Sequence, residues 1–185
     1  MKYAGIGSRQ TPTEILHLME DFGYAFACEA LLRSGGAEGA DLAFEFGARL
    51  GGGQTEIYLP WKGFNDRINN HYMSAPSPAA IELAKQYHPG WNHLTQGAKL
   101  LIARNGHQVL GKNLDDPVDM VICWTNNGSI TGKEPNTGGT GQALRIAADH
   151  PGIQVYNLKN RDHLEWLQEV IGDDGIPLGR TTIVV

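Results

Sequence analysis

The chain contains few cysteines, and their spacing argues against a metal centre. Its 185 residues include two cysteines, Cys28 and Cys123, which lie far apart and lack the Cys-x-x-Cys or Cys/His spacing of a zinc site. No tight pair of histidine ligands occurs either. We therefore expect two buried free thiols in a reducing compartment, with no metal and no disulfide.

Long apolar runs and an excess of basic residues are also absent. No segment has the roughly 20 consecutive apolar residues needed to cross a bilayer, and the N-terminus lacks the basic start and apolar stretch of a secretory signal. A cytoplasmic protein without a membrane partner is expected. The formal net charge is −5, whereas a general nucleic-acid coat needs a surplus of lysine and arginine. Any contact with nucleic acid must be local.

Two common nucleotide-binding motifs are missing. No GxxxxGK[ST] sequence occurs, which excludes a P-loop ATPase. The run Gly5-Ile6-Gly7 is followed by Gln10 instead of the third glycine of GxGxxG, and no acidic residue ends a second strand to hold a ribose. The sequence therefore argues against NAD, and we expect no cofactor.

The chain instead repeats one unit three times: a short apolar strand, a polar glycine-rich turn and an amphipathic helix. Thr11 is expected to cap the first of these helices, with Pro12 at its first position. The expected strands cover residues 3–6, 31–34 and 118–125, the turns 7–12, 35–41 and 136–141, and the helices 13–32, 42–50 and 142–149.

The remaining segments complete an α/β pattern. It predicts strands at 56–60 and 152–158, helices near 79–87, 95–107 and 162–171, and an edge strand or loose tail at 180–185. Strands that alternate with helices favour a parallel sheet. We predict one α/β domain over residues 1–185, a Rossmann-like three-layer sandwich with a mainly parallel central sheet. Residues 65–115 are a candidate helical lid or dimerisation insert.

The three glycine-rich turns are the candidate ligand site. Ligands of parallel sheets bind beyond the carboxyl ends of the strands, where all three turns are expected to lie. Glycine lets backbone amides approach an anion, and a helix N-terminus adds about half a positive charge. A single such turn is often only a tight connection, but three together favour a phosphorylated ligand. Lys99, Arg104 and Asn105 of the middle helix are candidates for adding polarity and positive charge at the mouth of this site.

Three blocks of sequence resemble the SLOG superfamily of Rossmann-like proteins. Gly5-Ile6-Gly7-Ser8-Arg9 resembles its Gly-Ser-Arg turn, residues 34–41 resemble the Ser-Gly-x-Ala-x-Gly-x-Asp turn of the DNA-processing protein A family, and residues 137–141 resemble the last glycine turn. The resemblance covers about residues 3–60 and 118–158. It implies a homodimer or higher homo-oligomer that captures a phosphorylated nucleotide or nucleotide-derived signal.

The expected ligand contacts follow from the resemblance and from the chemistry of the turns. Arg9 can offer two parallel N–H groups to a phosphate, although a surface ion pair is its rival role. Asp41 either caps its helix or binds a ribose hydroxyl. Trp124, at the end of a strand, either stacks on a base or packs in the core. The full set is Gly7, Ser8, Arg9, Ser34, Gly35, Gly36, Ala37, Gly39, Asp41, Trp124, Thr137, Gly138, Gly139, Thr140 and Gly141.

Two alternative functions remain open at this level. The chain is more weakly similar to the Lonely Guy family, whose phosphoribohydrolases use a glutamate four positions beyond their last glycine, but Arg145 stands there. A nucleoside 5′-monophosphate N-glycosidase would therefore need another carboxylate, and the candidates are Glu38, Asp41 and Glu45. The second alternative is a mediator of recombination that binds single-stranded DNA.

Overall fold

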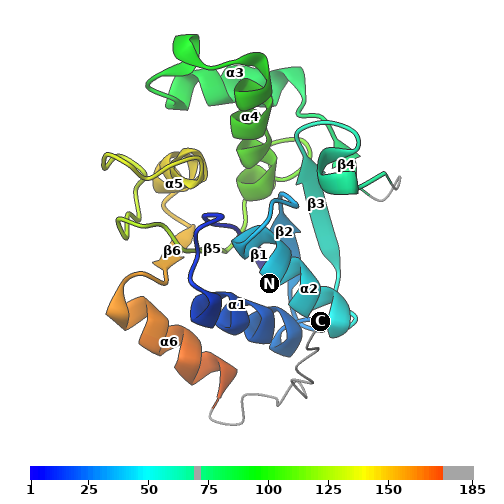
Figure 1. Cartoon of the computed structure of the whole chain (residues 1–185), viewed down its shortest axis with the longest axis vertical. Coiled ribbons are helices and arrows are strands. Elements are labelled where there is room, and N and C mark those ends of the chain that lie inside the picture. The colour runs from blue at the N-terminus through cyan, green and yellow to red at the C-terminus, as the bar shows by residue number, and fades with distance from the viewer. Residues whose placement is uncertain (69–71, 173–185) are drawn as a thin grey trace.

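The computed structural model describes residues 1–68 and 72–172, and within them the strands form one parallel sheet of order β4-β3-β2-β1-β5-β6 (Figure 1). This confirms the predicted α/β class and its Rossmann-like three-layer sandwich. None of the described helices combines the length and apolar character that a membrane span requires. The strands are β1 (Lys2–Gly5), β2 (Leu31–Ser34), β3 (Thr55–Leu59), β4 (Met73–Ser74), β5 (Met120–Cys123) and β6 (Gln154–Asn157). The helices are α1 (Thr13–Ala25), α2 (Ala40–Leu50), α3 (Pro78–Tyr87), α4 (Gln96–Leu110), α5 (Thr140–Ala148) and α6 (Arg161–Ile171), with 3₁₀ turns η1 (Phe64–Asp66) and η2 (Trp91–His93).

The two faces of the sheet bury separate cores because successive side chains of a strand point to opposite sides. Tyr3 of β1 packs into a core with residues of α1, α2 and α6. Its neighbour Ala4 packs into a second core with residues of α4 and α5. Figure 1 shows α1, α2 and α6 on one side of the sheet and α3, α4 and α5 on the other. These are the three layers.

The strand order reverses at β1. From β1 the chain moves outward through β2 and β3 to β4, and it then returns to β5 on the other side of β1, where Tyr3 pairs with Met120. The connections that leave the carboxyl ends of β1 and β5 consequently diverge to opposite faces. Such a switch point opens a crevice in which open α/β sheets bind ligands.

The first helix is shorter than its apolar periodicity predicted. It ends at Ala25 instead of residue 32, because the segment that follows makes a turn and then enters the sheet, where Leu31 pairs with Lys2. The pairing of a central strand prevails over helical periodicity here. The N-cap is Pro12 and not Thr11, whose hydroxyl donates to the Ser8 carbonyl oxygen at 2.7 Å. The edge strand or tail expected at 180–185 lies outside the described residues.

The middle segment contains both helices expected in it. The second half of α4, from Ile102 onward, is buried, and Val109 and Leu110 join the core beneath β1 and β5. Helix α4 is thus the crossover helix that returns the chain to the centre of the sheet. The buried half of α4 therefore belongs to the helical layer that also contains α5.

The two thiols have opposite environments, which corrects the expectation that both are buried. Cys28 is exposed in the turn after α1, whereas Cys123 is buried in β5. Burial raises the pKa of the Cys123 thiol to about 12. We expect one thiol per chain to react with Ellman's reagent in the native state and both to react in urea. Rapid reaction of both thiols in the native protein would contradict this placement.

A buried histidine makes stability depend on pH. The Nε2 atom of His107 accepts the Ser77 amide at 3.1 Å, and Nδ1 lies 3.0 Å from the Gly111 carbonyl oxygen, so the neutral ring with a proton on Nδ1 satisfies both. Burial lowers the pKa of His107 in the folded protein, while the unfolded value is near 6.5. Below that pH the unfolded chain binds a proton that the folded chain does not.

We therefore expect the folded state to lose stability as the pH falls below about 6.5, by at most about 1.4 kcal/mol per pH unit from this group. The measurement is the free energy of unfolding in urea between about pH 5 and pH 8. The His107→Gln variant should show a flatter dependence, since glutamine does not titrate. Identical pH profiles for the two proteins would refute this assignment.

Candidate functional site

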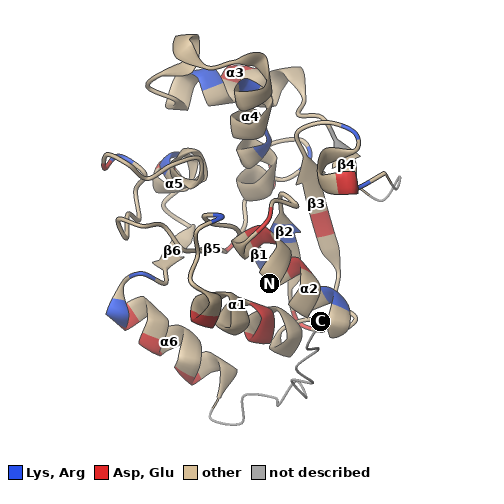
Figure 2. Cartoon of the chain, in the orientation of Figure 1, with Lys and Arg blue, Asp and Glu red and all other residues tan. Residues whose placement is uncertain are grey.

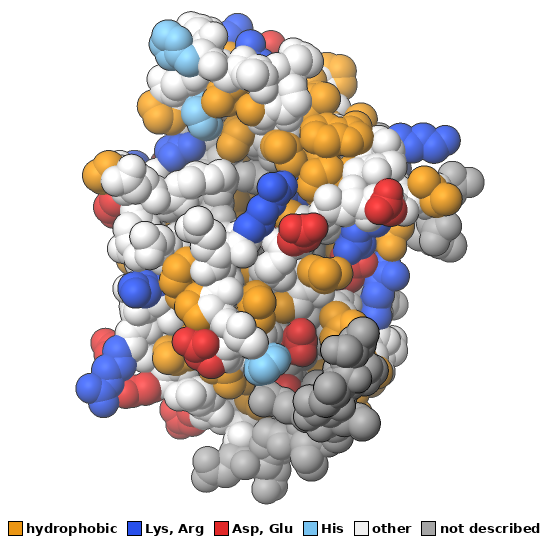
Figure 3. All heavy atoms as spheres, viewed as in Figure 1, with side chains coloured by type: hydrophobic (Ala, Val, Ile, Leu, Met, Phe, Trp, Pro, Cys, Tyr) orange, Lys and Arg blue, Asp and Glu red, His pale blue; other side chains and the backbone are white. Residues whose placement is uncertain are grey.

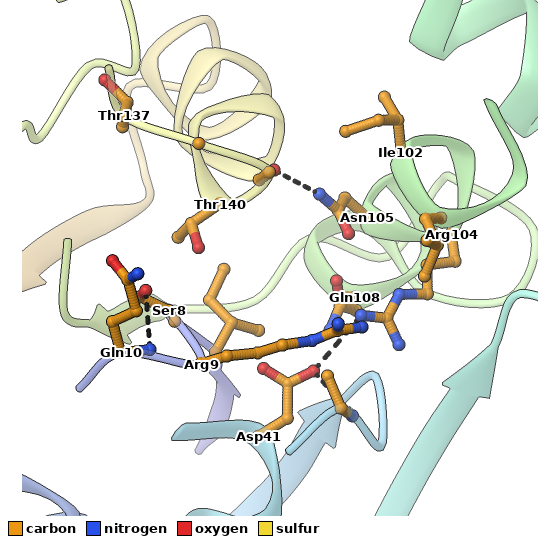
Figure 4. Close-up of a pocket in the computed structure, with 16 residues that line it drawn as sticks. Ser8, Arg9, Gln10, Asp41, Ile102, Arg104, Asn105, Gln108, Thr137 and Thr140 are labelled. Carbon is orange, nitrogen blue, oxygen red and sulfur yellow. Dashed lines mark hydrogen bonds and ion pairs between the residues drawn. The ribbon is translucent and has the colours of Figure 1, made fainter. Parts of the chain in front are cut away.

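A cavity of about 450 Å³ opens at the switch point, between the turn after β1, the start of α2, helix α4 and the turn before α5 (Figure 4). It thus joins all three glycine-rich turns to the crossover helix. In the space-filling view, basic and acidic side chains meet near the centre of the viewed face, below α4 (Figure 3). The lining residues are Ile6, Gly7, Ser8, Arg9, Gln10, Ala37, Asp41, Leu101, Ile102, Arg104, Asn105, Gln108, Thr137, Gly138, Gly139 and Thr140.

The first two turns contact each other through their backbones. Gly39 has a φ of +82°, and a Cβ atom there would lie 2.8 Å from the Ser8 carbonyl oxygen. At Gly7 a Cβ atom would lie 2.7 Å from that of Ala40. Glycine is required at both positions, by its positive φ at Gly39 and by close approach at each. These contacts bring the start of α2 next to the turn that carries Ser8 and Arg9.

The carboxylate of Asp41 lies in the nest formed by the first two turns. Its Oδ2 accepts the Ala37 amide at 3.4 Å, and the amides of Gly7 and Gly35 also interact with it. Burial raises the pKa of Asp41, while Arg104 and these amides oppose the rise. The resemblance implies that the 35–41 turn contacts the ligand. In the structure, two of the amides of the 35–41 turn serve a carboxylate of the chain itself.

Two arginines line this cavity, and one of them pairs with the carboxylate. Arg104 is buried, places Nη2 3.5 Å from the Asp41 Oδ2 atom and donates from Nη1 to the Gly35 carbonyl oxygen. Arg9 is exposed and reaches across the cavity toward Gln108 and Arg104 (Figure 4). Burial lowers the pKa of Arg104, and the charge of Arg9 adds to this effect. The cavity therefore carries more positive than negative charge.

The turn before α5 presents backbone amides to the cavity. Among the described residues, none accepts a hydrogen bond from the amides of Gly138, Gly139 or Thr140. They stand at the N-terminus of a nine-residue helix, where amides attract an anion. The Asn105 amide donates to the Gly139 carbonyl oxygen at 2.9 Å and so attaches the turn to α4. Figure 4 shows the Thr140 side chain directed into the cavity.

The rest of the wall combines apolar residues with the side-chain amides of Gln10 and Gln108. Ile6, Leu101 and Ile102 supply the apolar surface. The residue Gln108 is 2% exposed, and no hydrogen bond joins its side-chain amide to another described residue. Because Gln108 lines the cavity, this amide is available to a bound molecule. This wall suits a flat heterocycle with hydrogen-bonding groups on its edge.

The charge around the cavity differs from the charge of the whole chain. Acidic positions lie along α1 and α6, whereas basic ones lie on α4 and in the turn after β1 (Figure 2). The net charge of −5 therefore does not describe the cavity. Within residues 1–68 and 72–172, no group of three or more histidine, cysteine or acidic side chains could hold a metal ion.

The structure gathers nine of the fifteen expected contact residues at the cavity and places the other six elsewhere. Ser34 is buried and donates its hydroxyl to the Gly5 carbonyl oxygen at 2.7 Å. Trp124 packs in the core, with the Lys159 Nζ atom 5.9 Å from its ring centre, so core packing describes it better than stacking on a ligand. Gly36 lines a separate cavity of about 300 Å³. Gly35, Gly39 and Gly141 lie outside the lining and support the turns through their backbones.

The three candidate catalytic carboxylates have different surroundings. Glu38 is exposed and faces the 300 Å³ cavity. Glu45 is buried in ion pairs with Arg67, at 2.6 Å, and Arg49, at 2.9 Å. Asp41 alone among them lines the 450 Å³ cavity, where Arg104 and backbone amides hold it.

Sequence reasoning missed most of the α4 wall. Of the residues expected on that helix, Arg104 and Asn105 line the cavity, but Lys99 lies 5.6 Å from the ring centre of Trp91 instead. Leu101, Ile102 and Gln108, together with Ile6 and Gln10 after β1, were not expected as ligand contacts. The one signal in the sequence for this wall was Gln108, a polar residue within the buried end of a helix.

No family model, no curated protein and no solved structure matches this chain. The fold itself defines a Rossmann-like α/β protein whose cavity lies at the switch point of its sheet. What the cavity does must be argued from the residues that line it.

Proposed function

We propose that the protein binds a phosphorylated nucleotide or nucleotide-derived signal molecule in the 450 Å³ cavity. The observation that carries the proposal is the turn before α5, whose three unpartnered amides face the same space as Arg9 and the amide of Gln108. The motif resemblance to the SLOG superfamily supports the same ligand class.

The phosphate belongs at the turn before α5. The amides of Gly138, Gly139 and Thr140 have no partner among the described residues, in contrast to the nest that holds Asp41. Arg9 supplies an exposed cation with two parallel donors. An anion there would also offset the repulsion between Arg9 and the buried Arg104.

The base belongs against α4. Leu101 and Ile102 offer an apolar surface, and Gln108 offers one donor group and one acceptor to the edge of a heterocycle. Pockets that take small ligands hold about 300–1,000 Å³, so a cavity of about 450 Å³ accommodates a nucleoside monophosphate.

Binding is better supported than hydrolysis. A general base or nucleophile needs a carboxylate free to reach the ribose, whereas Asp41 is held by Arg104 and backbone amides. At the position where the Lonely Guy family has its glutamate, Arg145 donates to the Gly132 carbonyl oxygen at 2.7 Å. Capture of a ligand, by contrast, requires no change in the protonation of Asp41 or of Arg145.

The test is to identify what the protein binds. Protein purified from its native host is denatured, and the released small molecules are identified by mass spectrometry. Fresh protein is then titrated calorimetrically with the four common nucleoside monophosphates and followed over time for release of free base. Saturable binding without free base supports the proposal. The absence of any binding across the panel rejects it, and the appearance of free base would establish the N-glycosidase alternative.

The expected homo-oligomer remains a prediction. Helix α2 exposes Leu42, Phe46 and Leu50 at four-residue intervals, with 45%, 54% and 51% of their surfaces accessible. Multi-angle light scattering should therefore report a species of at least twice the 20.1 kDa chain mass. A single 20.1 kDa species over the whole concentration range would contradict the prediction.

A further inference from the structure

A second cavity, of about 550 Å³, lies on the other side of the turn before α5. It shares Thr137 and Gly138 with the first cavity. The end of α3 forms one wall, the loop that precedes α5 forms another, and Arg145 of α5 completes it. One turn therefore separates two hollows, and its unpartnered amides stand at the border.

The second cavity is also cationic. Arg145 is fixed by the Gly132 carbonyl oxygen and by the Gln142 Oε1 atom, and its buried Nε has no partner. No carboxylate of the described chain forms an ion pair with Arg145 or with the exposed Lys133. The one acidic residue of this wall, Glu134, accepts hydrogen bonds from the hydroxyls of Ser129 and Thr131. These bonds leave the charge of Glu134 in place, so the wall carries two cations and one carboxylate and remains net positive.

The turn that separates the two cavities leaves open space at Gly138. Gly138 is exposed, and a Cβ atom added to it would have no heavy atom within 4 Å. A chain of atoms can therefore cross the turn at this residue without displacing protein. A pair of linked phosphates is the most favourable group to place across the turn. Backbone amides lie at Gly138, Arg9 lies on one side of the turn, and Lys133 and Arg145 lie on the other.

We propose that the ligand is a nucleoside diphosphate ester, with its nucleoside in the first cavity, its pyrophosphate across Gly138 and its second half in the 550 Å³ cavity. This inference rests on the proposed function and narrows it. A monophosphate fills the first cavity alone, whereas the ester also neutralises the two cations beyond the turn. The second half is polar and uncharged or anionic, because the wall that receives it is cationic.

Calorimetric titration of the full chain tests this with matched pairs of probes: AMP against ADP-ribose, GMP against GDP-mannose, UMP against UDP-glucose and CMP against CDP-glucose. For the preferred base, the ester should bind at least tenfold more tightly than the monophosphate. Lys133→Glu should abolish most of that advantage and change monophosphate affinity by less than twofold. Lys112→Glu, the same charge change on an exposed lysine after α4, should leave both affinities unchanged.

The outcomes separate the two proposals. If a monophosphate binds but its ester binds no more tightly, or if Lys133→Glu has no selective effect, the diphosphate inference is wrong and the proposed function stands. If no probe binds, both fail. A urea unfolding curve of each variant, expected to match the wild type because both lysines are exposed, excludes a folding defect as the cause.

Discussion

Replacement of Arg9 by alanine should weaken binding of the nucleoside monophosphate by about 10- to 150-fold, or about 1.5–3 kcal/mol, the usual contribution of hydrogen bonds to a charged group. Arg9 is the exposed cation of the cavity, and the other one, Arg104, is already committed to Asp41 and Gly35. Isothermal titration calorimetry of the wild type and the variant measures the effect directly.

The controls separate binding from folding. Because Arg9 is exposed and forms no ion pair within the described chain, its loss should leave the free energy of unfolding nearly unchanged. Arg9→Lys should give an intermediate affinity, since lysine keeps the charge but not the paired donors. Arg161→Ala removes an arginine with an 88% exposed side chain on α6 and should change neither property. An unaltered affinity in Arg9→Ala would exclude Arg9 from the phosphate site.

Replacement of Asp41 by asparagine should destabilise the fold by about 3–5 kcal/mol, the cost of removing one partner of a buried ion pair. Asp41 is 3% exposed, and its carboxylate balances the buried Arg104 and accepts backbone amides of both turns. Asparagine has the same shape but no charge, so it leaves Arg104 uncompensated. If its NH₂ group points toward the backbone amides, donors face donors. The free energy of unfolding in urea is the measurement.

A double variant distinguishes the ion pair from simple loss of packing. Asp41→Leu combined with Arg104→Met removes both charges, and it should be more stable than Asp41→Asn alone. Glu82→Gln, a neutral replacement at an exposed position of α3, should change stability by less than about 0.5 kcal/mol. A loss below about 1 kcal/mol in Asp41→Asn would mean that Asp41 is protonated or hydrated in the native protein.

The strand-turn-helix units could be predicted because their signals are local. Apolar periodicity and glycine-rich turns identified the elements around β1, β2 and β5, and the switch-point cavity follows from the way that parallel sheets connect. The end of α1 could not be predicted in this way. Residues 26–32 continue the apolar pattern, and only the pairing of Leu31 beside Lys2 marks where the helix has ended and strand β2 begins.

The same distinction between local signals and tertiary contacts applies to the residues expected to contact the ligand. The sequence alone determined the three turns, since Gly39 and Gly7 are recognisable from their motifs and contact their neighbours through the backbone. Trp124 illustrates the limit of such reasoning: a tryptophan at the end of a strand can face a ligand or a core, and packing against the helices decides in favour of the core.

Tertiary structure alone decided what faces these turns. Arg104 lies more than 60 positions from Asp41 in the sequence, and the crossover helix brings the two together to form the buried pair. The same helix supplies Gln108 and the apolar wall. No local pattern encodes these contacts, because they depend on where a returning helix lies across the sheet. The sequence by itself therefore determined where the glycine-rich turns lie, and the fold decided which of their amides have no partner among the described residues.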